Sequence, residues 1–256
     1  MSEAVATGVT VRRDGGVATV AIDRPAKRNA LTFAMYRALN AAITEADADP
    51  DVRVIVLTGS GGAFTAGNDL ADFLSGKDVV GGEESAVLGF QRAVLERGTI
   101  LIAAVDGSAV GIGATVLLHC DLVYATERSY LQFPFVDIGL VPEFGSSLLL
   151  PRRVGAVRAA EILLLGDRLP AARAAELGLV NQIFADHETL LAHVTEQASR
   201  LLAKPSAAVA ATWALLHGNP DQTTRQRMVD ESARFSDLLS SPAAVQRLEG
   251  FLNGRK

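Results

Sequence analysis

The chain contains 256 residues, of which 49% are hydrophobic and 21% are charged, and its formal net charge is −5. These proportions are typical of a globular protein with a sizeable core, and they exclude a disordered or fibrous chain. The negative charge, with no run of more than two Lys or Arg, argues against a nucleic-acid-binding surface. The single cysteine excludes a disulfide framework and a multi-cysteine zinc site.

Strands and helices alternate over the first 200 residues. Runs of β-branched and apolar residues predict strands over 9–13, 17–23, 52–58, 99–105, 121–125, 130–133 and 180–184. Apolar residues at helical spacing predict a helix that begins after Thr32, a second over 85–96, and a third that opens at 109–113 and runs through His119. The Gly-rich segment 75–84 is expected to be mobile. The repeated order of strand, Gly-rich turn and helix predicts a right-handed spiral of ββα-like units.

From residue 144 onward, almost all of the chain is predicted to be helical, apart from the strand over 180–184. Helices are expected over 146–150, 157–165, 170–177, 187–202, 205–217, 222–239 and 242–252. We therefore expect an α/β core over residues 1–200 and a helical C-terminal region over residues 201–256. No stretch approaches the roughly 18 apolar residues that a membrane span needs. Residues 1–8 lack the pattern of a signal peptide, so a cytoplasmic location is expected.

Two Gly-containing turns follow predicted buried strands, and each precedes a helix or helical turn. They are Ala66-Gly67-Asn68 and Gly111-Ile112-Gly113. Backbone N–H groups at such turns lack intrahelical partners, and two of them converging on one oxygen form an oxyanion hole. The alternative is that both are ordinary strand-to-helix turns. The adjacent His119 and Cys120 are not expected to form a catalytic pair, since neighbours at a helix end point in different directions, and Cys120 is interpreted as a small core residue.

The order of several motifs resembles that of one enzyme superfamily. The motifs lie at 24–31 (RPAKRNAL), 64–70 (FTAGNDL), 105–113 (VDGSAVGIG), 120–125 (CDLVYA), 139–143 (GLVPE), 150–152 (LPR) and 175–180 (AELGLV). Together they span most of the chain and resemble the crotonase, or enoyl-CoA hydratase/isomerase, superfamily. The Asn68-Asp69-Leu70 variant of the first loop and the position of Glu143 resemble the Δ3,Δ2-enoyl-CoA isomerase branch.

This resemblance implies a crotonase-like spiral and acyl-CoA thioester substrates of fatty-acid β-oxidation. It implies a homotrimer or dimer of trimers formed through the C-terminal helices, and neither a metal nor a redox cofactor, because coenzyme A belongs to the substrate. By position, the N–H groups of Asn68 and Ile112 match the two oxyanion donors. The residues expected to bind the acyl-CoA are Ala26, Lys27, Ala30, Ala66, Gly67, Asn68, Asp69, Leu70, Gly111, Thr115 and Phe135.

The same resemblance separates hydration from isomerisation. Hydratases of the superfamily use two glutamates, and at the matching positions this chain has Thr115 and Phe135. Glu143 is the carboxylate that remains, and apolar neighbours in sequence favour a raised basicity. We therefore expect Glu143 to act as the base, although a carboxylate that caps the following helix has the same sequence pattern. Asp69 and Asp137 are weaker candidates.

The expected reaction moves the double bond of a 3-enoyl-CoA into the 2-trans position through a dienolate, with Glu143 as base and then acid. Two other activities remain open from the sequence: an isomerase for ring-containing (epoxide or oxepin-type) acyl-CoA substrates of aromatic catabolism, and a residual hydratase. A non-catalytic binding scaffold with the same fold is a further alternative.

Overall fold

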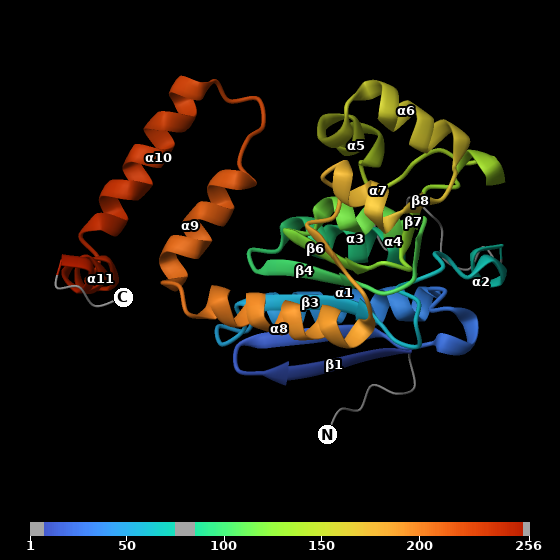
Figure 1. Ribbon diagram of the computed structural model, residues 1–256, viewed down its shortest axis with the longest axis horizontal. Coiled ribbons are helices and arrows are strands. Elements are labelled where there is room, and N and C mark those ends of the chain that lie inside the picture. The colour runs from blue at the N-terminus through green and yellow to red at the C-terminus, as the bar shows by residue number, and fades with distance from the viewer. Residues whose placement is uncertain (1–7, 75–84, 253–256) are drawn as a thin grey trace. The chain divides into compact units, whose positions relative to one another are not determined.

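The computed structural model describes residues 8–74 and 85–252 (Figure 1), so the segment expected to be mobile lies outside the described residues. The chain divides into two compact units, Met1–Gln197 and Ala198–Lys256, and each is described by itself.

A six-stranded sheet forms the centre of the first unit, in the order β1-β2-β3-β4-β6-β9. Its strands are β1 Val9–Asp14, β2 Val17–Ile22, β3 Val54–Gly59, β4 Ile100–Val105, β6 Leu122–Thr126 and β9 Gln182–Phe184. The hairpin β1–β2 is antiparallel, and the other pairs are parallel. All six residues of β3 are buried, as expected for a strand covered on both faces.

A second sheet has three short strands in the order β5-β7-β8, namely β5 Ser108–Val110, β7 Tyr130–Gln132 and β8 Leu169–Pro170. The two sheets agree with the predicted spiral of strand–turn–helix units. Two strands were not predicted, β5 and β8, because they have only three and two residues and are held by partners distant in sequence. The third predicted helix begins at Ile112 instead of near residue 109, since β5 occupies residues 108–110.

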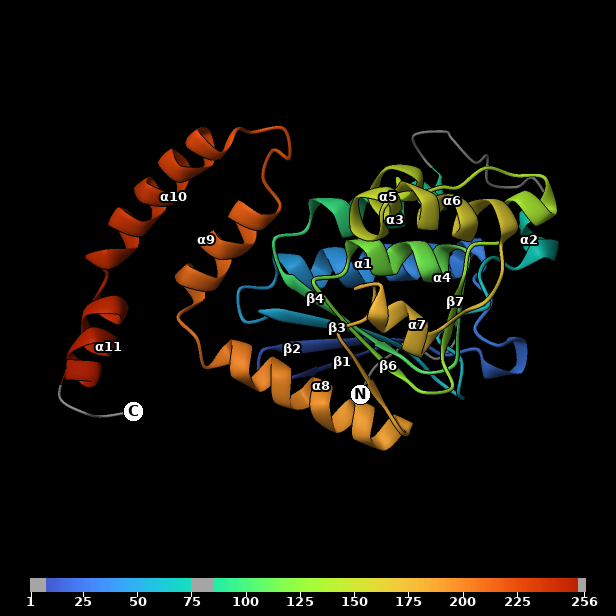
Figure 2. The same ribbon diagram turned by 45° about the horizontal axis from the view of Figure 1, so that its top comes forward.

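Helices cover both faces of the large sheet (Figure 2). The helices that begin in the first unit are α1 Phe33–Ala48, α2 Leu70–Leu74, α3 Ala86–Glu96, α4 Ile112–Thr115, α5 Ser146–Val154, α6 Ala156–Leu165, α7 Ala171–Glu176 and α8 His187–Leu202, with 3₁₀ helices η1 Pro25–Lys27, η2 Val116–His119 and η3 Val136–Ile138. The boundary between the two units falls within α8, after Gln197. Thr32 caps α1 as predicted, because its side chain accepts a hydrogen bond from the N–H of Met35. On the other face, His193 of α8 packs edge-on against Tyr124 of β6.

Helix α5 is longer than the predicted 146–150. It continues through Pro151 to Val154, and the N–H of Gly155 donates to the carbonyl of Pro151 at 3.0 Å. Proline removes one helical donor, but its fixed φ fits the helix, so the helix continues past it at the cost of one hydrogen bond.

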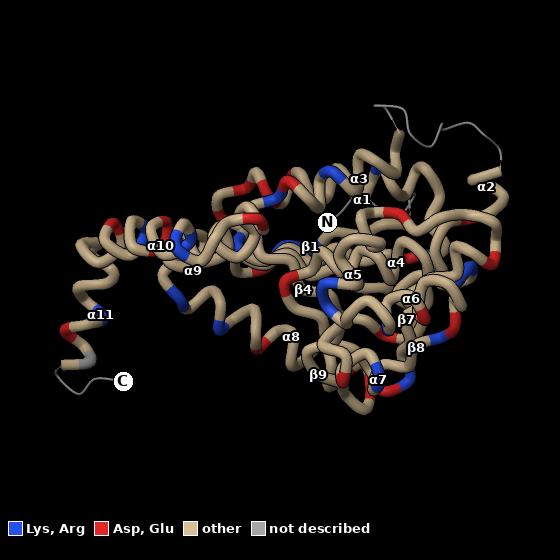
Figure 3. Tube along the Cα trace, turned by 90° about the horizontal axis from the view of Figure 1, so that it is seen from above, with Lys and Arg blue, Asp and Glu red and all other residues tan. Residues whose placement is uncertain are grey.

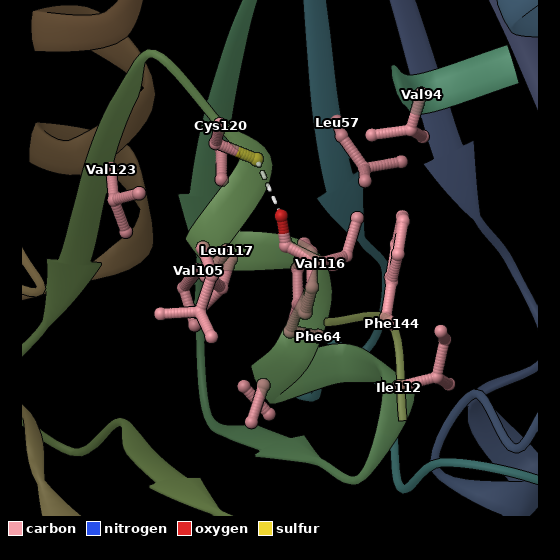
Figure 4. Close-up of a cluster of buried hydrophobic side chains, with 14 of the residues drawn as sticks. Leu57, Phe64, Val94, Val105, Ile112, Val116, Leu117, Cys120, Val123 and Phe144 are labelled. Atoms are coloured by element: carbon pink, nitrogen blue, oxygen red, sulfur yellow. Dashed lines mark hydrogen bonds between the residues drawn. The ribbon is translucent and has the colours of Figure 1, made fainter. Parts of the chain in front are cut away.

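The hydrophobic core is formed by buried residues of the large sheet and of the helices that pack against it. Figure 4 shows Ile112 and Phe144 in one cluster with Leu57 of β3 and Val116 of η2. Cys120 belongs to this core as predicted, and its thiol donates to the carbonyl of Val116 at 3.4 Å.

The second unit contains α9 Ser206–Leu216, α10 Thr224–Leu239 and α11 Pro242–Leu252. A capping box at Thr223 and Gln226 begins α10, which carries both acidic and basic residues (Figure 3). Arg227 of α10 donates to the carbonyls of Leu215 and Asn219 and so joins α10 to the end of α9. None of the helices in the described part of the chain is long and apolar enough to span a membrane.

One buried asparagine fastens the loop between β2 and α1 to the loop after β3. Asn29 has a left-handed backbone with φ +59°, and its amide nitrogen donates to the carbonyls of Ser60 at 2.9 Å and Ala63 at 2.6 Å. Its amide oxygen accepts from the N–H of Arg24 at 2.8 Å, and its own carbonyl accepts from Thr65. This residue therefore fixes the start of the loop 64–70.

We expect the substitution Asn29→Ala to lower the free energy of unfolding by about 2–4 kcal/mol, because it leaves buried backbone groups unpaired and places alanine at a positive φ. Chemical denaturation measures this loss. Lys27→Ala, at an exposed position in the same loop, is the matched control. A loss within about 0.5 kcal/mol of the control would contradict the role of Asn29.

Candidate active site

The structure brings the two Gly-containing turns together. Thr65 and Ala109 form an isolated parallel bridge, in which the N–H of Thr65 donates to Ser108 at 2.8 Å and the N–H of Val110 donates to Thr65 at 3.1 Å. A second bridge joins Leu31 to Asn68. The loop 65–68 is therefore held between the segment before α1 and the strand β5.

Two glycines permit this close approach. A side chain at Gly67, where φ is +89°, would place its Cβ 3.0 Å from the carbonyl oxygen of Val110. A Cβ at Gly113 would lie 2.3 Å from Cγ2 of Thr65. Any larger residue at either position would separate the two turns.

Within residues 8–74 and 85–252, the two N–H groups expected as oxyanion donors have no hydrogen-bond partner. The N–H of Gly111 donates to Gln132, and those of Ala114 and Thr115 both donate to Gly111. Asp69 donates from its N–H to Leu31. The backbone N–H groups of Asn68 and Ile112, in contrast, donate to no described residue, and Ile112 is the first residue of α4. Free donors at such positions are suited to an oxygen that carries negative charge.

Glu143 lies beside the first turn of α4. Its Oε1 accepts a hydrogen bond from the hydroxyl of Thr115, one turn after Ile112, and its Oε2 accepts from the amide of Gln91 on α3. Burial raises the pKa of Glu143 to about 7, and the hydrogen bonds from Thr115 and Gln91 oppose that increase. A carboxyl with this pKa is ionised in an appreciable fraction near neutral pH and is also basic enough to take a proton from carbon.

Tyr36 of α1 is bonded to the first turn. It is almost completely buried, and its hydroxyl donates to the side-chain oxygen of Asn68. Burial and, secondly, the negative charge of Glu143 raise the pKa of Tyr36 well above its usual value. Tyr36 is therefore neutral, and its hydroxyl holds the side chain of Asn68.

His119 supports the backbone next to Glu143. Its ring stacks on Phe144 with centroids 3.9 Å apart, and its Nε2 lies 2.8 Å from the carbonyl oxygen of Phe144. Burial lowers the pKa of His119 to about 4, so the ring is neutral and Nε2 carries the proton that this bond requires. Phe144 has a φ of +54°, an uncommon conformation for a bulky residue, and the contact with His119 stabilises it.

The expected CoA-binding loop lies before α1 and next to α2. Asp69 forms an ion pair with Arg24 at 2.7 Å and accepts from two N–H groups of α2, and the hydrogen bond from Arg24 lowers its pKa. Its carboxylate therefore has a structural function, because it joins Arg24 to the first turn of α2. Ala26, Lys27 and Leu70 are exposed, and Ala30 and Ala66 are half-buried.

The two positions where hydratases of the superfamily would have glutamates hold neutral side chains. Thr115 is fully buried and bonded to Glu143, and Phe135 belongs to the hydrophobic cluster that contains Ile112 and Phe144. Asp137 is exposed on η3. Glu143 is thus the acidic residue that the structure joins to Thr115.

Sequence reasoning missed three residues of this site, namely Tyr36, Gln91 and His119. Tyr36 and His119 have the pattern of core residues. Gln91, in contrast, stands among Ala86, Val87, Phe90 and Val94 on the buried face of α3. A single polar residue on an apolar helical face is a signal that could have identified it.

Comparison with known proteins decides the family. The family model described as enoyl-CoA hydratase/isomerase matches residues 12–256. The chain belongs to the enoyl-CoA hydratase/isomerase family. The solved structure of an enoyl-CoA hydratase from Polaromonas sp. JS666 is similar to it with a TM-score of 0.86 and 28% identity, covering 96% of this chain and 97% of that chain. The crotonase fold expected from the sequence is therefore confirmed.

The curated relatives have two kinds of names. Enoyl-CoA delta isomerase 2 from Rattus norvegicus is 38% identical over 70% of this chain and 46% of its own length, so the chain spans about half of that relative. A protein named "Probable enoyl-CoA hydratase" from Rhodobacter capsulatus is 33% identical over 94% of this chain and 93% of its own length. The family thus acts on acyl-CoA thioesters, and the names include both reactions.

The buried charge of Glu143 has a measurable effect on stability. The folded protein binds the proton of Glu143 more tightly than the unfolded chain does, because the pKa is about 7 in the folded protein and ordinarily 4.5. The stability gained from this proton is therefore complete below about pH 4.5 and is lost as the pH rises through 7. We expect Glu143→Gln to raise the free energy of unfolding above pH 7 by on the order of 1–3 kcal/mol, since one pKa unit corresponds to about 1.4 kcal/mol. Denaturation at several pH values measures this difference, and a gain that does not shrink toward acidic pH would contradict the assignment.

Proposed function

We propose that this protein is an enoyl-CoA isomerase that converts a 3-enoyl-CoA to the 2-trans-enoyl-CoA. The observation that carries the proposal is the carboxyl of Glu143, which has a pKa of about 7 and is bonded to Thr115, a residue at a position where hydratases have a glutamate. The N–H groups of Asn68 and of Ile112, one turn before Thr115, donate to none of the residues that the structure describes. Such a site has one group to move a proton and two donors to stabilise an enolate oxygen.

In the proposed reaction, the thioester carbonyl oxygen accepts hydrogen bonds from the N–H groups of Asn68 and Ile112. Glu143 removes a proton from C2, and the electron pair of that C–H bond passes into a dienolate whose negative oxygen the two donors stabilise. The carboxylic acid then returns the same proton to C4. The double bond moves from C3–C4 to C2–C3, and no atom is gained or lost.

One carboxyl suffices for both transfers, because C2 and C4 lie on the same side of the planar dienolate, within reach of a single group. A hydratase, in contrast, needs a second polar group to hold and activate the water. Thr115 is engaged with Glu143, and Phe135 is apolar and buried. The match to two relatives named enoyl-CoA delta isomerase, at 38% and 33% identity, supports isomerisation.

The test is to mix the purified protein separately with 3-hexenoyl-CoA and with crotonyl-CoA and to follow the absorbance of the conjugated enoyl thioester. We expect the absorbance to rise with 3-hexenoyl-CoA and to remain constant with crotonyl-CoA. Loss of absorbance with crotonyl-CoA would mean that the protein is a hydratase. No change with either substrate would contradict the proposal and favour a ring-containing acyl-CoA substrate or a binding function.

A further inference from the structure

The two oxygens of the Glu143 carboxyl are held by donors of different chemistry. Gln91 donates to Oε2 from α3, and Thr115 donates to Oε1 from α4. An amide NH₂ group can only donate, whereas a hydroxyl has one proton to donate and lone pairs to accept. The Thr115 hydroxyl also lies 3.3 Å from the carbonyl oxygen of Ile112, so its single proton has two possible acceptors.

Among the described residues, the ionisable groups that face Glu143 do not change charge in the pH range where Glu143 titrates. Tyr36 faces it from α1 with a pKa well above 10, and His119 of η2, behind Phe144, has a pKa of about 4. Phe90 and Phe144 are apolar, and the hydroxyl of Ser146 on α5 donates to the backbone carbonyl of Glu143 at 2.7 Å. The two side-chain hydrogen bonds are therefore the means by which the protein opposes the effect of burial on this carboxyl.

Resting on the proposed isomerisation, we propose that Gln91 is a positioning residue that fixes Oε2 of Glu143 as a hydrogen-bond acceptor, so that the moving proton is carried on Oε1. When Oε1 takes the proton from C2, the hydroxyl of Thr115 turns its own proton to the carbonyl oxygen of Ile112. When the proton leaves for C4, the hydroxyl donates to Oε1 again. One C–H bond breaks and one O–H bond forms in the first step, the second step reverses this at C4, and Thr115 keeps its proton throughout.

The proton is expected on Oε1 because protonation of each oxygen weakens the hydrogen bond from its donor, and of the two donors only Thr115 has a second acceptor among the described residues. A protonated carboxyl oxygen is a poorer acceptor than a carboxylate oxygen, because it has lost its negative charge. A proton on Oε2 would weaken the bond from Gln91, whose amide lies on the apolar buried face of α3. A proton on Oε1 weakens the bond from Thr115, which has the carbonyl of Ile112 as a second acceptor.

The experiment is a direct titration of the Glu143 carboxyl in the ligand-free protein by difference infrared spectroscopy, with Glu143→Gln as the blank. The variants are Gln91→Met and Thr115→Val, which remove the donors at nearly constant volume, and Thr115→Ser, which retains a hydroxyl. Gln132→Met, which removes a similar amide bonded to the carbonyl of Gly166, is the matched control.

We expect the titration midpoint to rise by about one pH unit in Gln91→Met and in Thr115→Val, because each loses a hydrogen bond to a charged group. At neutral pH the ionised fraction then falls up to about tenfold, and the acidic limb of the pH profile of kcat/KM moves upward by the same amount. The midpoint of Thr115→Ser and of Gln132→Met is expected to stay at the wild-type value.

An unchanged midpoint in Gln91→Met, with a circular dichroism spectrum like that of the wild type, would overturn the inference. If Gln91→Met does not fold, Gln91→Leu, which also lacks the donor to Oε2, takes its place in the same titration. A rise in Thr115→Ser equal to that in Thr115→Val would overturn the role of the hydroxyl. Because the titration needs no substrate, a wild type that fails to isomerise 3-hexenoyl-CoA refutes the proposed function and leaves the titration unaffected.

Discussion

The chemistry proposed for this protein depends on a buried carboxyl group that is still ionised in an appreciable fraction near neutral pH. Burial favours the neutral form of Glu143 and raises its pKa, while the hydrogen bonds from Gln91 and Thr115 favour the charged form. The balance lies close to neutrality, where a group can accept a proton in one step and return it in the next. Burial alone would keep Glu143 protonated at neutral pH, and the hydrogen bonds alone would leave a carboxylate too weakly basic to take a proton from carbon.

The fold provides this balance by joining segments far apart in sequence. The bridges Thr65–Ala109 and Leu31–Asn68 place two turns side by side, and the N–H groups of Asn68 and Ile112 have no partner in the part of the chain that the structure describes. Glu143 comes from a third segment, whose backbone is held in an uncommon conformation at Phe144. Strain and unpaired donors lower stability, and their presence together at one place is typical of an active site.

Much of this architecture could be predicted from the sequence, because its signals are local. The hairpin β1–β2, the cap of α1 at Thr32 and the buried strands follow from residue type and spacing, and the order of motifs indicated the family. The short strand β5 and the partners of Glu143 could not be predicted with the same reasoning. They depend on contacts between elements distant in the chain, and Gln91 is separated from Glu143 by 52 residues.

The most direct test of the account is the turnover of 3-hexenoyl-CoA by Glu143→Gln beside the control Asp137→Asn, which changes an exposed acid in the preceding segment. The account predicts that Glu143→Gln loses about 10²–10⁴-fold in kcat, the usual contribution of a general base, while its affinity for the acyl-CoA is retained. Asp137→Asn is expected to resemble the wild type. Turnover by Glu143→Gln within a few-fold of the wild type would contradict the assignment of Glu143 as the base.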